Sequence, residues 1–346
     1  MGSSAFQGSI KWWCLRHRLH HRFTDDPVHD PYAATRGLFY SHIGWIFFKP
    51  NYERLETVDR EDLVSDPVVR FQHAYYVPIA IICGFVIPTV VGIAWDDPLG
   101  SLIWGGLISK LAIWHCTFLV NSCVTVGEVV LLIVRCPISR LAHWNGLQPY
   151  SDEDTSRGNL LLALLTGGEG NHNFHAFPHD FRSGPSPTDW DPSKWFILAL
   201  HQLRLVSGLR RAKDSDLKEA IKYMRLKTHF ADLVKEEEPD HWMGDVWNEA
   251  QLFTYIQAVP GKCVMEIDGF VIDATNYLGE HPGGPRLLRK YSIRKTLDAS
   301  WAFAGGLNNH SRAAKGQMRS LRVAKMLRDS EQIYHGSRIS TNNQDI

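Results

Sequence analysis

Three histidines near the start of the chain have a spacing that could hold a metal ion. His17, His20 and His21 lie in the segment HRLHH. On a helix, positions i, i+3 and i+4 fall within about 100° of arc on one face, so three imidazoles can converge on one place. Imidazole binds zinc, copper and iron, so the residue type alone does not choose the metal. The alternative for a single cluster of this kind is a basic, solvent-exposed helix face.

A second histidine cluster repeats this spacing further along the chain. His172 and His175 stand at i and i+3 in NHNFHAFPHD, with His179 one turn further on. Two clusters on either side of an apolar hairpin are stronger evidence for a metal site than one, because a hairpin returns the chain to the side that it left. We therefore expect both clusters to meet at one membrane face.

Two apolar segments between the clusters must bring them together. Residues 75–95 carry no charge, and residues 99–120 are apolar except for Lys110. A membrane span needs about 20 apolar residues, so these segments predict a transmembrane helical hairpin with a turn at residues 96–98. Their tyrosine and tryptophan ends suit the membrane interface. The alternative is a buried helical hairpin of a soluble protein, since prolines and glycines dilute both segments.

Two further histidines occur in the last third of the chain. His281 opens HPGG, and His310 lies in GGLNNHSRAA. Two histidines on separate loops can ligate a haem iron from both sides, and such a site transfers electrons because no coordination position stays open. Gly283 and Gly284 would let the backbone turn closely beside a flat macrocycle. The alternative is a turn with an incidental histidine.

Composition excludes several other classes of protein. Lys plus Arg and Asp plus Glu each number 37, and this zero formal charge argues against a nucleic-acid binder. A hydrophobic share of 44% argues against a disordered tail. The six cysteines show no CxxC and no regular spacing, so neither a disulfide framework nor a zinc knuckle is predicted. No signal peptide is predicted either, so membrane insertion must come from internal spans.

Changes in composition divide the chain into four parts. We expect a partial membrane domain over residues 1–204, followed by a charged linker with a solvated helix over residues 205–245. Residues 246–328 combine short β-branched runs with helical ones, which is typical of a small mixed α and β domain. Residues 329–346 form a polar tail.

Seven segments carry a resemblance to a known family. They are GSIKWW (8–13), HRLHHRFTD (17–25), DPY (30–32), YSHIGW (40–45), GEGNHNFH (168–175), IDGFVIDATNYLGEHPGG (267–284) and NNHSRAA (308–314). In these segments the chain resembles the acyl-CoA delta-9 (stearoyl-CoA) desaturases, in the fungal form with a C-terminal cytochrome b5 domain. The resemblance implies a mushroom-like, mainly α-helical membrane desaturase domain followed by a small α+β cytochrome b5-like domain. It also implies a multi-pass protein of the endoplasmic reticulum membrane, with its active site and its b5 domain in the cytosol.

The resemblance also implies cofactors, partners and residue roles. It implies a non-haem centre of two iron ions held by His17, His20, His21, Asn121, His143, His172 and His175, with no catalytic side chains beyond the metal ligands. It implies haem b with His281 and His310 as axial ligands. The implied reaction places a cis double bond in stearoyl- or palmitoyl-CoA. The implied partners are saturated acyl-CoA, O2, NADH-cytochrome b5 reductase and the lipid bilayer, with no nucleic acid.

The sequence departs from the family pattern at three places. The family's first histidine box and first membrane hairpin would precede Gly8, so we expect an N-terminally truncated chain. The third box of the family reads HxxHH, whereas Ala176 follows His175 here. Asn121-Ser122 and residues 141–143 match the two halves of an Asn-Ser-Leu-Ala-His segment, so residues 123–140 are expected to be an insertion.

Two other functions stay open at this point. One is an inactive or incomplete desaturase remnant that acts only as a membrane-tethered cytochrome b5 electron carrier. The other is a different histidine-box enzyme fused to cytochrome b5, such as a lipid hydroxylase or a front-end desaturase. These enzymes carry the haem domain at the N-terminus or show other box spacings, so GSIKWW and YSHIGW favour the delta-9 desaturases.

Overall fold

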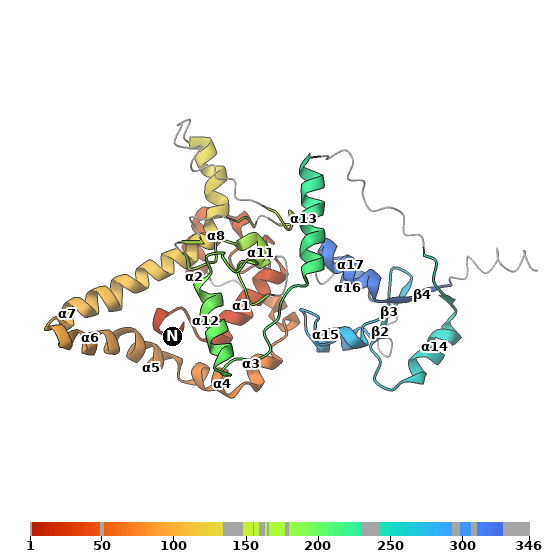
Figure 1. Ribbon diagram of the computed structural model, residues 1–346, viewed down its shortest axis with the longest axis horizontal. Coiled ribbons are helices and arrows are strands. Elements are labelled where there is room, and N and C mark those ends of the chain that lie inside the picture. The colour runs from red at the N-terminus through yellow and green to blue at the C-terminus, as the bar shows by residue number, and fades with distance from the viewer. Residues whose placement is uncertain are drawn as a thin grey trace, which may run out of the picture. The chain divides into compact units, whose positions relative to one another are not determined.

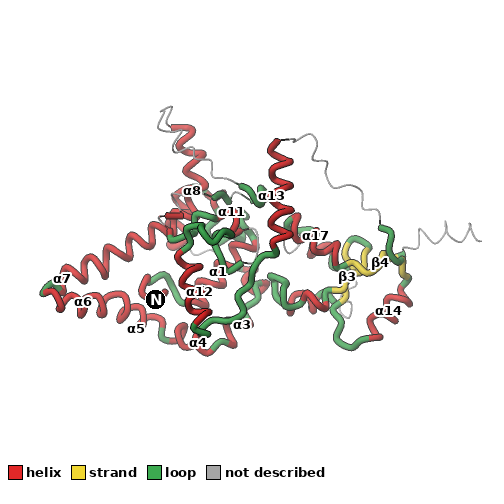
Figure 2. Tube along the Cα trace, in the orientation of Figure 1, coloured by secondary structure: helices red, strands yellow, loops and turns green. Residues whose placement is uncertain are grey.

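The chain forms two units, each with its own core. The computed structural model describes residues 2–48, 52–133, 148–154, 156–158, 163–164, 166–176, 180–229, 242–292, 298–305 and 310–327. Contacts divide it into unit 1, Met1–Val234, and unit 2, Lys235–Ile346. Figure 1 follows the chain by colour, and Figure 2 shows that the sheet lies in the C-terminal part. A mostly helical protein with a small mixed α and β part at its C-terminal end was expected from the sequence.

Helix α1 (Ile10–Arg22) carries the first histidine cluster. The Oγ atom of Ser9 caps the helix by accepting a hydrogen bond from the backbone N–H of Trp12. Leu15 and Leu19 bury one face of α1 in a core shared with Phe23, Val58 and Leu63. Because this apolar face fixes the helix, the histidines that project from its other side have defined positions.

Short helical elements precede α1 and connect it to the apolar hairpin. They are η1 (Gly2–Ala5), η2 (Ala34–Arg36), η3 (Tyr40–Gly44), α2 (Trp45–Phe47), η4 (Glu53–Thr57), α3 (Glu61–Ser65) and α4 (Pro67–Ala74). The carboxylate of Asp66 caps α4 by accepting hydrogen bonds from the N–H groups of Val68 and Val69. A group that we name the aromatic cluster packs beside these elements; it comprises Trp12, Trp13, Tyr32, Tyr40, Trp45, Trp114 and Phe118.

Two long helical segments form the hairpin, which Figure 1 shows as an extended arm of unit 1. Its first limb comprises α5 (Tyr76–Ile81), η5 (Ile82–Val86), α6 (Ile87–Gly92) and η6 (Ile93–Trp95). Its second limb comprises α7 (Pro98–Ser101), η7 (Leu102–Ile108) and α8 (Ser109–Ile133). The membrane-capable parts, Tyr76–Trp95 and Pro98–Ser122, coincide with the predicted ranges to within two residues.

The apolar side chains of the hairpin are mostly exposed. Only 17% and 22% of the most apolar windows of the two helices are buried. Val90, Ile93, Leu99 and Trp104 are each more than half exposed. A core helix of a soluble protein would bury this surface. The alternative of a buried soluble hairpin therefore gains no support from the described residues, whereas both helices are long and apolar enough to cross a membrane.

The predicted insertion at residues 123–140 begins as a helix. Residues 123–133 continue α8 beyond Ser122, so this part of the segment extends the second limb and does not form a loop. Residues 134–147, which include His143, lie outside the described residues.

Where the structure describes the rest of unit 1, it contains the helices α11 (His172–Ala176), α12 (Pro192–Gln202) and α13 (Asp214–His229). Helix α13 falls in the predicted linker at residues 205–245. It buries Leu217, Ala220 and Met224 along one side, so it is not solvated all round.

Unit 2 contains a four-stranded sheet in the order β1-β4-β3-β2. The strands are β1 (Val246–Trp247), β2 (Val264–Ile267), β3 (Phe270–Asp273) and β4 (Arg322–Met326). Strands β2 and β3 pair antiparallel across a two-residue turn, Asp268-Gly269, in which both residues have positive φ. Asp-Gly favours this turn because glycine adopts positive φ without strain. The remaining elements are α14 (Glu249–Ala258), η9 (Thr275–Tyr277), α15 (Pro285–Lys290), α16 (Ser300–Phe303) and α17 (Arg312–Ser320).

The sheet of unit 2 has a separate core on each face. Alternate residues of β2 point to opposite sides, as strand geometry requires. Met265 and Ile267 join the core that contains Leu288, Phe303 and Met318 of α15, α16 and α17. Val264 joins the other core, with Leu252 and Tyr255 of α14. Helices α15, α16 and α17 therefore cover one face of the sheet, and α14 covers the other.

Candidate metal centre

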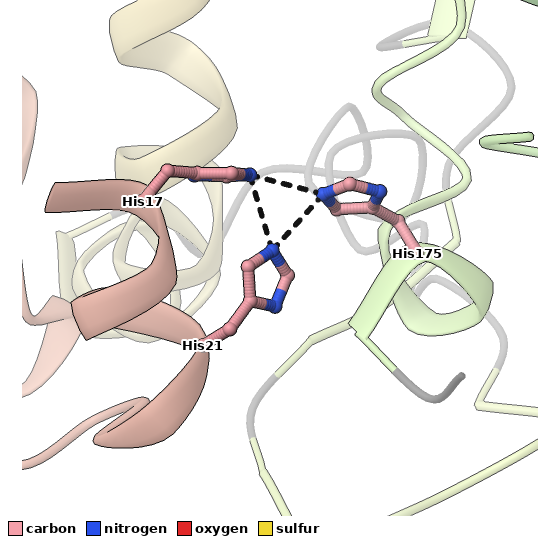
Figure 3. Close-up of side chains that lie close together, drawn as sticks. All are labelled: His17, His21 and His175. Carbon is pink, nitrogen blue, oxygen red and sulfur yellow. Dashed lines mark hydrogen bonds between the residues drawn. The ribbon is translucent and has the colours of Figure 1, made fainter. Parts of the chain in front are cut away.

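Three histidines from two distant segments converge at one point in unit 1. The Nε2 atoms of His17 and His21 on α1 lie 3.1 Å apart. The Nε2 atom of His175 on α11 lies 3.2 Å from that of His17 and 3.1 Å from that of His21. Figure 3 shows the three rings pointing their Nε2 atoms at one another. The structure thus brings the two predicted histidine clusters together, and we name these three residues the histidine triangle.

The spacing of the histidine triangle fits a metal ion. If the metal–nitrogen bonds are about 2.1 Å long, nitrogens separated by these distances subtend about 95° at the ion. That angle is close to the right angle of an octahedral site and smaller than the tetrahedral angle of structural zinc sites. These three histidines would hold one metal ion, which would supply redox or Lewis-acid chemistry at this point.

The protonation of the rings also favours metal binding. Burial and then the neighbouring histidines lower the pKa of His17 and of His21 well below the usual value. The same causes lower the pKa of His172. These rings are therefore neutral near pH 7, and neutral imidazole is the form that binds a metal ion.

His20 and His172 form a second pair beside the triangle. The ring centroids are 6.3 Å apart and the planes are nearly parallel. His20 Nδ1 lies 2.8 Å from a carboxylate oxygen of Asp30, and both side chains are buried. Burial opposes protonation of His20, but the charge and hydrogen bond of Asp30 outweigh it and raise the pKa of His20. His172 Nδ1 is buried and has no hydrogen-bond partner among the described residues. A metal ion held here would satisfy a nitrogen that is otherwise costly to bury.

Tyr32 connects the histidine triangle to the aromatic cluster. Its hydroxyl oxygen lies 2.9 Å from Nδ1 of His17. When that oxygen accepts the Nδ1 proton, Nε2 of His17 keeps the lone pair that a metal needs. The Tyr32 ring lies 4.5 Å from the ring of His20 and 5.4 Å from that of Trp45. Burial raises the pKa of Tyr32 well above the usual value, so its hydroxyl stays protonated.

Asn173 lies between His172 and His175 in the sequence of α11, and its side chain holds this helix in position. Its side chain is 1% exposed. The Oδ1 atom accepts a hydrogen bond from the backbone N–H of Tyr150 at 3.0 Å. The Nδ2 group donates to the carbonyl oxygens of Ser151 and Ser156 at 2.7 and 3.0 Å. These bonds fix the direction in which His175 projects.

Two further residues, Asn121 and His143, were predicted at the di-iron centre. Asn121 is half-buried in α8, and no described contact joins it to the five clustered histidines. His143 lies outside the described residues, as does His179.

A further histidine pair was not predicted from the sequence. His42 Nε2 lies 3.0 Å from His115 Nδ1, and His42 Nδ1 lies 2.9 Å from Oγ of Ser122. His115 shares one face of α8 with Phe118, through an i, i+3 spacing that could have drawn attention to it. Asp30 and Tyr32 lie in the DPY segment that carries the family resemblance. Their contacts with His20 and His17 could not be predicted without the fold.

The two histidines predicted to bind haem lie in unit 2. The N–H of His310 Nδ1 donates to the carbonyl oxygen of Phe303 at 2.8 Å, and the two rings stack. This tautomer leaves a lone pair on Nε2, the form that binds an iron ion. At Gly283, a β carbon would come within 2.9 Å of the His281 ring, so this close approach requires glycine. The assignment of both histidines as haem ligands stays a prediction.

Comparison with curated proteins gives similarities along most of the chain. The chain is 36% identical over 329 residues to "Acyl-CoA desaturase 1" of Saccharomyces cerevisiae, a match that covers 93% of this chain and 59% of that protein. It is 33% identical over 333 residues to the "Probable acyl-CoA desaturase" of Schizosaccharomyces pombe, covering 93% and 62%. It is 35% identical over 214 residues to "Stearoyl-CoA desaturase 5" of Bos taurus, covering 61% and 59%. No protein-family model matches the chain.

The two fungal matches cover more of this chain than the bovine match does. An alignment over 93% of this chain has to include most of unit 2, so both fungal proteins contain a counterpart of both units. The bovine match covers 61% of the chain. The chain spans about 60% of the length of these three relatives.

Proposed function

We propose that the chain belongs to the acyl-CoA desaturase family and is a membrane acyl-CoA delta-9 desaturase of the fungal type. The substrates would be stearoyl- and palmitoyl-CoA, together with O2. The convergence of His17 and His21 with His175, which lies 154 residues beyond His21, supports this proposal most directly. Their three ligand nitrogens lie within reach of one metal ion.

The histidines would hold two iron ions. The histidine triangle offers one binding position, and His20 with His172 offers part of a second, with His143 and Asn121 as further proposed ligands. The bound irons would supply the activation of O2 and the removal of two hydrogens from the acyl chain. The protein would supply neutral imidazoles at fixed positions, with Asp30 and Tyr32 holding two of the rings by hydrogen bonds.

The aromatic cluster would hold the acyl chain next to the metal ions. It touches the centre through Tyr32 and Trp13, whose ring lies 6.2 Å from that of His17. A saturated chain has no polar group with which to fix its position, so its orientation has to come from packing against apolar walls. Aromatic rings provide large rigid walls for this purpose and also exclude water.

Unit 2 would deliver the electrons as a cytochrome b5 domain. His281 and His310 would be the axial ligands of haem b, and an NADH-cytochrome b5 reductase would reduce it. Fusion to unit 1 raises the effective concentration of this electron carrier at the iron centre. We propose that the hairpin crosses the endoplasmic reticulum membrane as part of a multi-pass domain, with both cofactor sites in the cytosol.

Iron and haem content test the proposal directly. The full chain is purified in detergent, supplied with Fe²⁺ and haem, and analysed for non-haem iron and for the haem spectrum. His21→Gln and His175→Gln should each lose most of the bound iron and keep the haem. His201→Gln is the matched control, because His201 lies on α12 and bonds to the carbonyl oxygen of Val206. This control should bind as much iron as the parent chain.

The reaction is tested with stearoyl-CoA, NADH and a cytochrome b5 reductase. The product should be oleoyl-CoA, and both histidine variants should abolish it. Two results would contradict the proposal: iron binding unchanged in His175→Gln, or a chain that is fully loaded with iron and haem and yet forms no unsaturated product.

A further inference from the structure

Unit 2 has a strong separation of charge along its sequence. Residues 235–284 carry ten Asp and Glu against two Lys and Arg. Residues 285–320 carry eight Lys and Arg against a single Asp. The chain as a whole has no formal net charge, so this division is a property of unit 2 and does not follow from the overall composition. It gives unit 2 one acidic and one basic part.

Six of these basic residues lie on one side of the sheet, and two of the acids, Glu249 and Asp273, lie on the other. Helices α15 and α17, which share one core on the same face, carry Arg286, Arg289, Lys290, Arg312, Lys315 and Arg319 and no acid. On the other face, α14 begins at Glu249, and Asp273 accepts a hydrogen bond from the hydroxyl of Tyr255 at 2.6 Å. We name the side formed by α15, α16 and α17 the basic face.

The basic face adjoins the histidines proposed to bind haem. His281 precedes α15 by four residues, and His310 precedes α17 by two. Between these helices in sequence, α16 presents Trp301 with 67% of its surface exposed. Tryptophan and arginine dominate the binding energy of many protein interfaces, so this side has the composition of a docking surface.

We infer that unit 2 docks through the basic face, centred on Trp301, onto an acidic surface of another redox protein. This inference rests on the proposed haem function, because it places the docking surface around His281 and His310. Complementary charge steers two redox proteins together and orients the haem edge toward the partner. Among the described residues of α15, α16 and α17, Trp301 is the single large apolar side chain that is exposed, whereas helices that lie on membranes present a whole apolar face. A protein partner is therefore favoured over a lipid surface.

Binding of two redox proteins of opposite charge tests this inference. The full chain in nanodiscs of uncharged lipid is titrated with an acidic flavodoxin and, separately, with a basic cytochrome c at low and high salt. Flavodoxin should bind more tightly, and its affinity should fall as salt screens the charges. The double variant Arg289→Glu with Lys290→Glu should weaken flavodoxin binding about tenfold. The matched control on the opposite face, Glu249→Lys, should leave it unchanged within a factor of two.

The haem spectrum distinguishes a failure of the proposed haem function from a failure of the docking inference. If the parent chain takes up no haem, both the haem function and the docking inference fail. If haem binds and flavodoxin shows no preference over cytochrome c, or the double variant binds it as well as the parent, only the docking inference fails. It also fails if the double variant loses binding to vesicles that contain phosphatidylserine while its binding to flavodoxin is unchanged, because the basic face would then be a lipid-binding surface.

Discussion

The Nδ1 atom of His20 lies 2.8 Å from Oδ1 of Asp30, and the two side chains are 9% and 0% exposed. The same carboxylate accepts hydrogen bonds from the backbone N–H groups of Asp25 and Tyr32. A carboxylate in this position fixes the ring and directs Nε2 away from itself. We expect Asp30→Asn to weaken iron binding by about ten- to a hundred-fold, measured by competition with a chelator.

Asp26→Asn is the matched control for this variant. Asp26 also contacts a histidine through Nδ1, at 2.9 Å from His29, but that pair is part of no metal cluster among the described residues. This control should bind iron as the parent chain does. Equal iron affinity in Asp30→Asn and in the parent would show that the contact with His20 does not position a ligand.

The side chain of Asn173 leads to a second prediction, about the stability of the site. In Asn173→Ala the N–H of Tyr150 and the carbonyl oxygens of Ser151 and Ser156 each lose a buried or partly buried hydrogen bond, although Ser156 keeps the one from Gln148. The free energy of unfolding should fall by about 3 kcal/mol, and iron binding should weaken because α11 is no longer held. Chemical denaturation with and without iron measures both effects.

Asn171→Ala provides the comparison for this variant. Asn171 donates a single, longer side-chain bond of 3.3 Å to the carbonyl oxygen of Gly168. Its loss should cost about 1 kcal/mol or less. Similar losses in the two variants would mean that the position of α11 does not depend on Asn173.

Local patterns made the first half of the site predictable. The i, i+3 and i+4 spacing on α1 correctly placed three histidines on one side of the helix. Helical geometry also explains why two of the three rings point to the histidine triangle and the third points to Asp30. His17 and His21 project about 40° apart and meet at the triangle, whereas His20 is about 60° away on the other side of His17 and faces Asp30. The uncharged runs fixed the hairpin to within two residues for the same reason, since length and apolarity are local properties.

The rest of the site depends on contacts that no local pattern contains. Nothing near Asn173 in sequence indicates that it would bond to residues 150, 151 and 156. The helical packing of α13 was missed because its many charges suggested a solvated linker, although every third or fourth residue is buried. The charge separation of unit 2 was hidden by the zero net charge of the whole chain.

Gly8 gives a third prediction, at the start of α1. Its φ is +104°, and a β carbon would lie 2.5 Å from Cε3 of Trp12, a member of the aromatic cluster. Gly8→Ala therefore combines backbone strain with a clash and should lower the free energy of unfolding by at least about 2 kcal/mol. Gly2→Ala is the control, because no atom lies within 4 Å of the added carbon and the change should have little effect. A Gly8→Ala variant as stable as the parent would contradict the backbone conformation described for this turn.

The ion pair between Asp180 and Arg182 gives a prediction about pH. The side chains are 1% and 7% exposed, and the carboxylate also accepts a hydrogen bond from the backbone N–H of Ala212. Burial opposes ionisation of Asp180, but the hydrogen bond from Arg182 and those from the backbone outweigh it and lower the pKa of Asp180. An acid whose pKa is lower in the folded state contributes stability above its unfolded pKa of about 3.9 and loses it as the pH falls through the folded value.

Asp180→Asn should therefore destabilise unit 1 in a pH-dependent way. Because the variant leaves Arg182 buried without its counter-charge, the free energy of unfolding should fall by about 3 kcal/mol near pH 7. The difference between parent and variant should shrink as the pH falls below about 4, because Asp180 is then protonated in the unfolded parent chain and, at still lower pH, in the folded one. Denaturation curves of both proteins between pH 7 and pH 3 give this difference directly.

Asp152→Asn serves as the control, since Asp152 pairs with Lys227 at the surface, where exposed ion pairs contribute at most about 1 kcal/mol. A parent-to-variant difference for Asp180 that is constant over the whole range would rule out a lowered pKa as the source of its contribution.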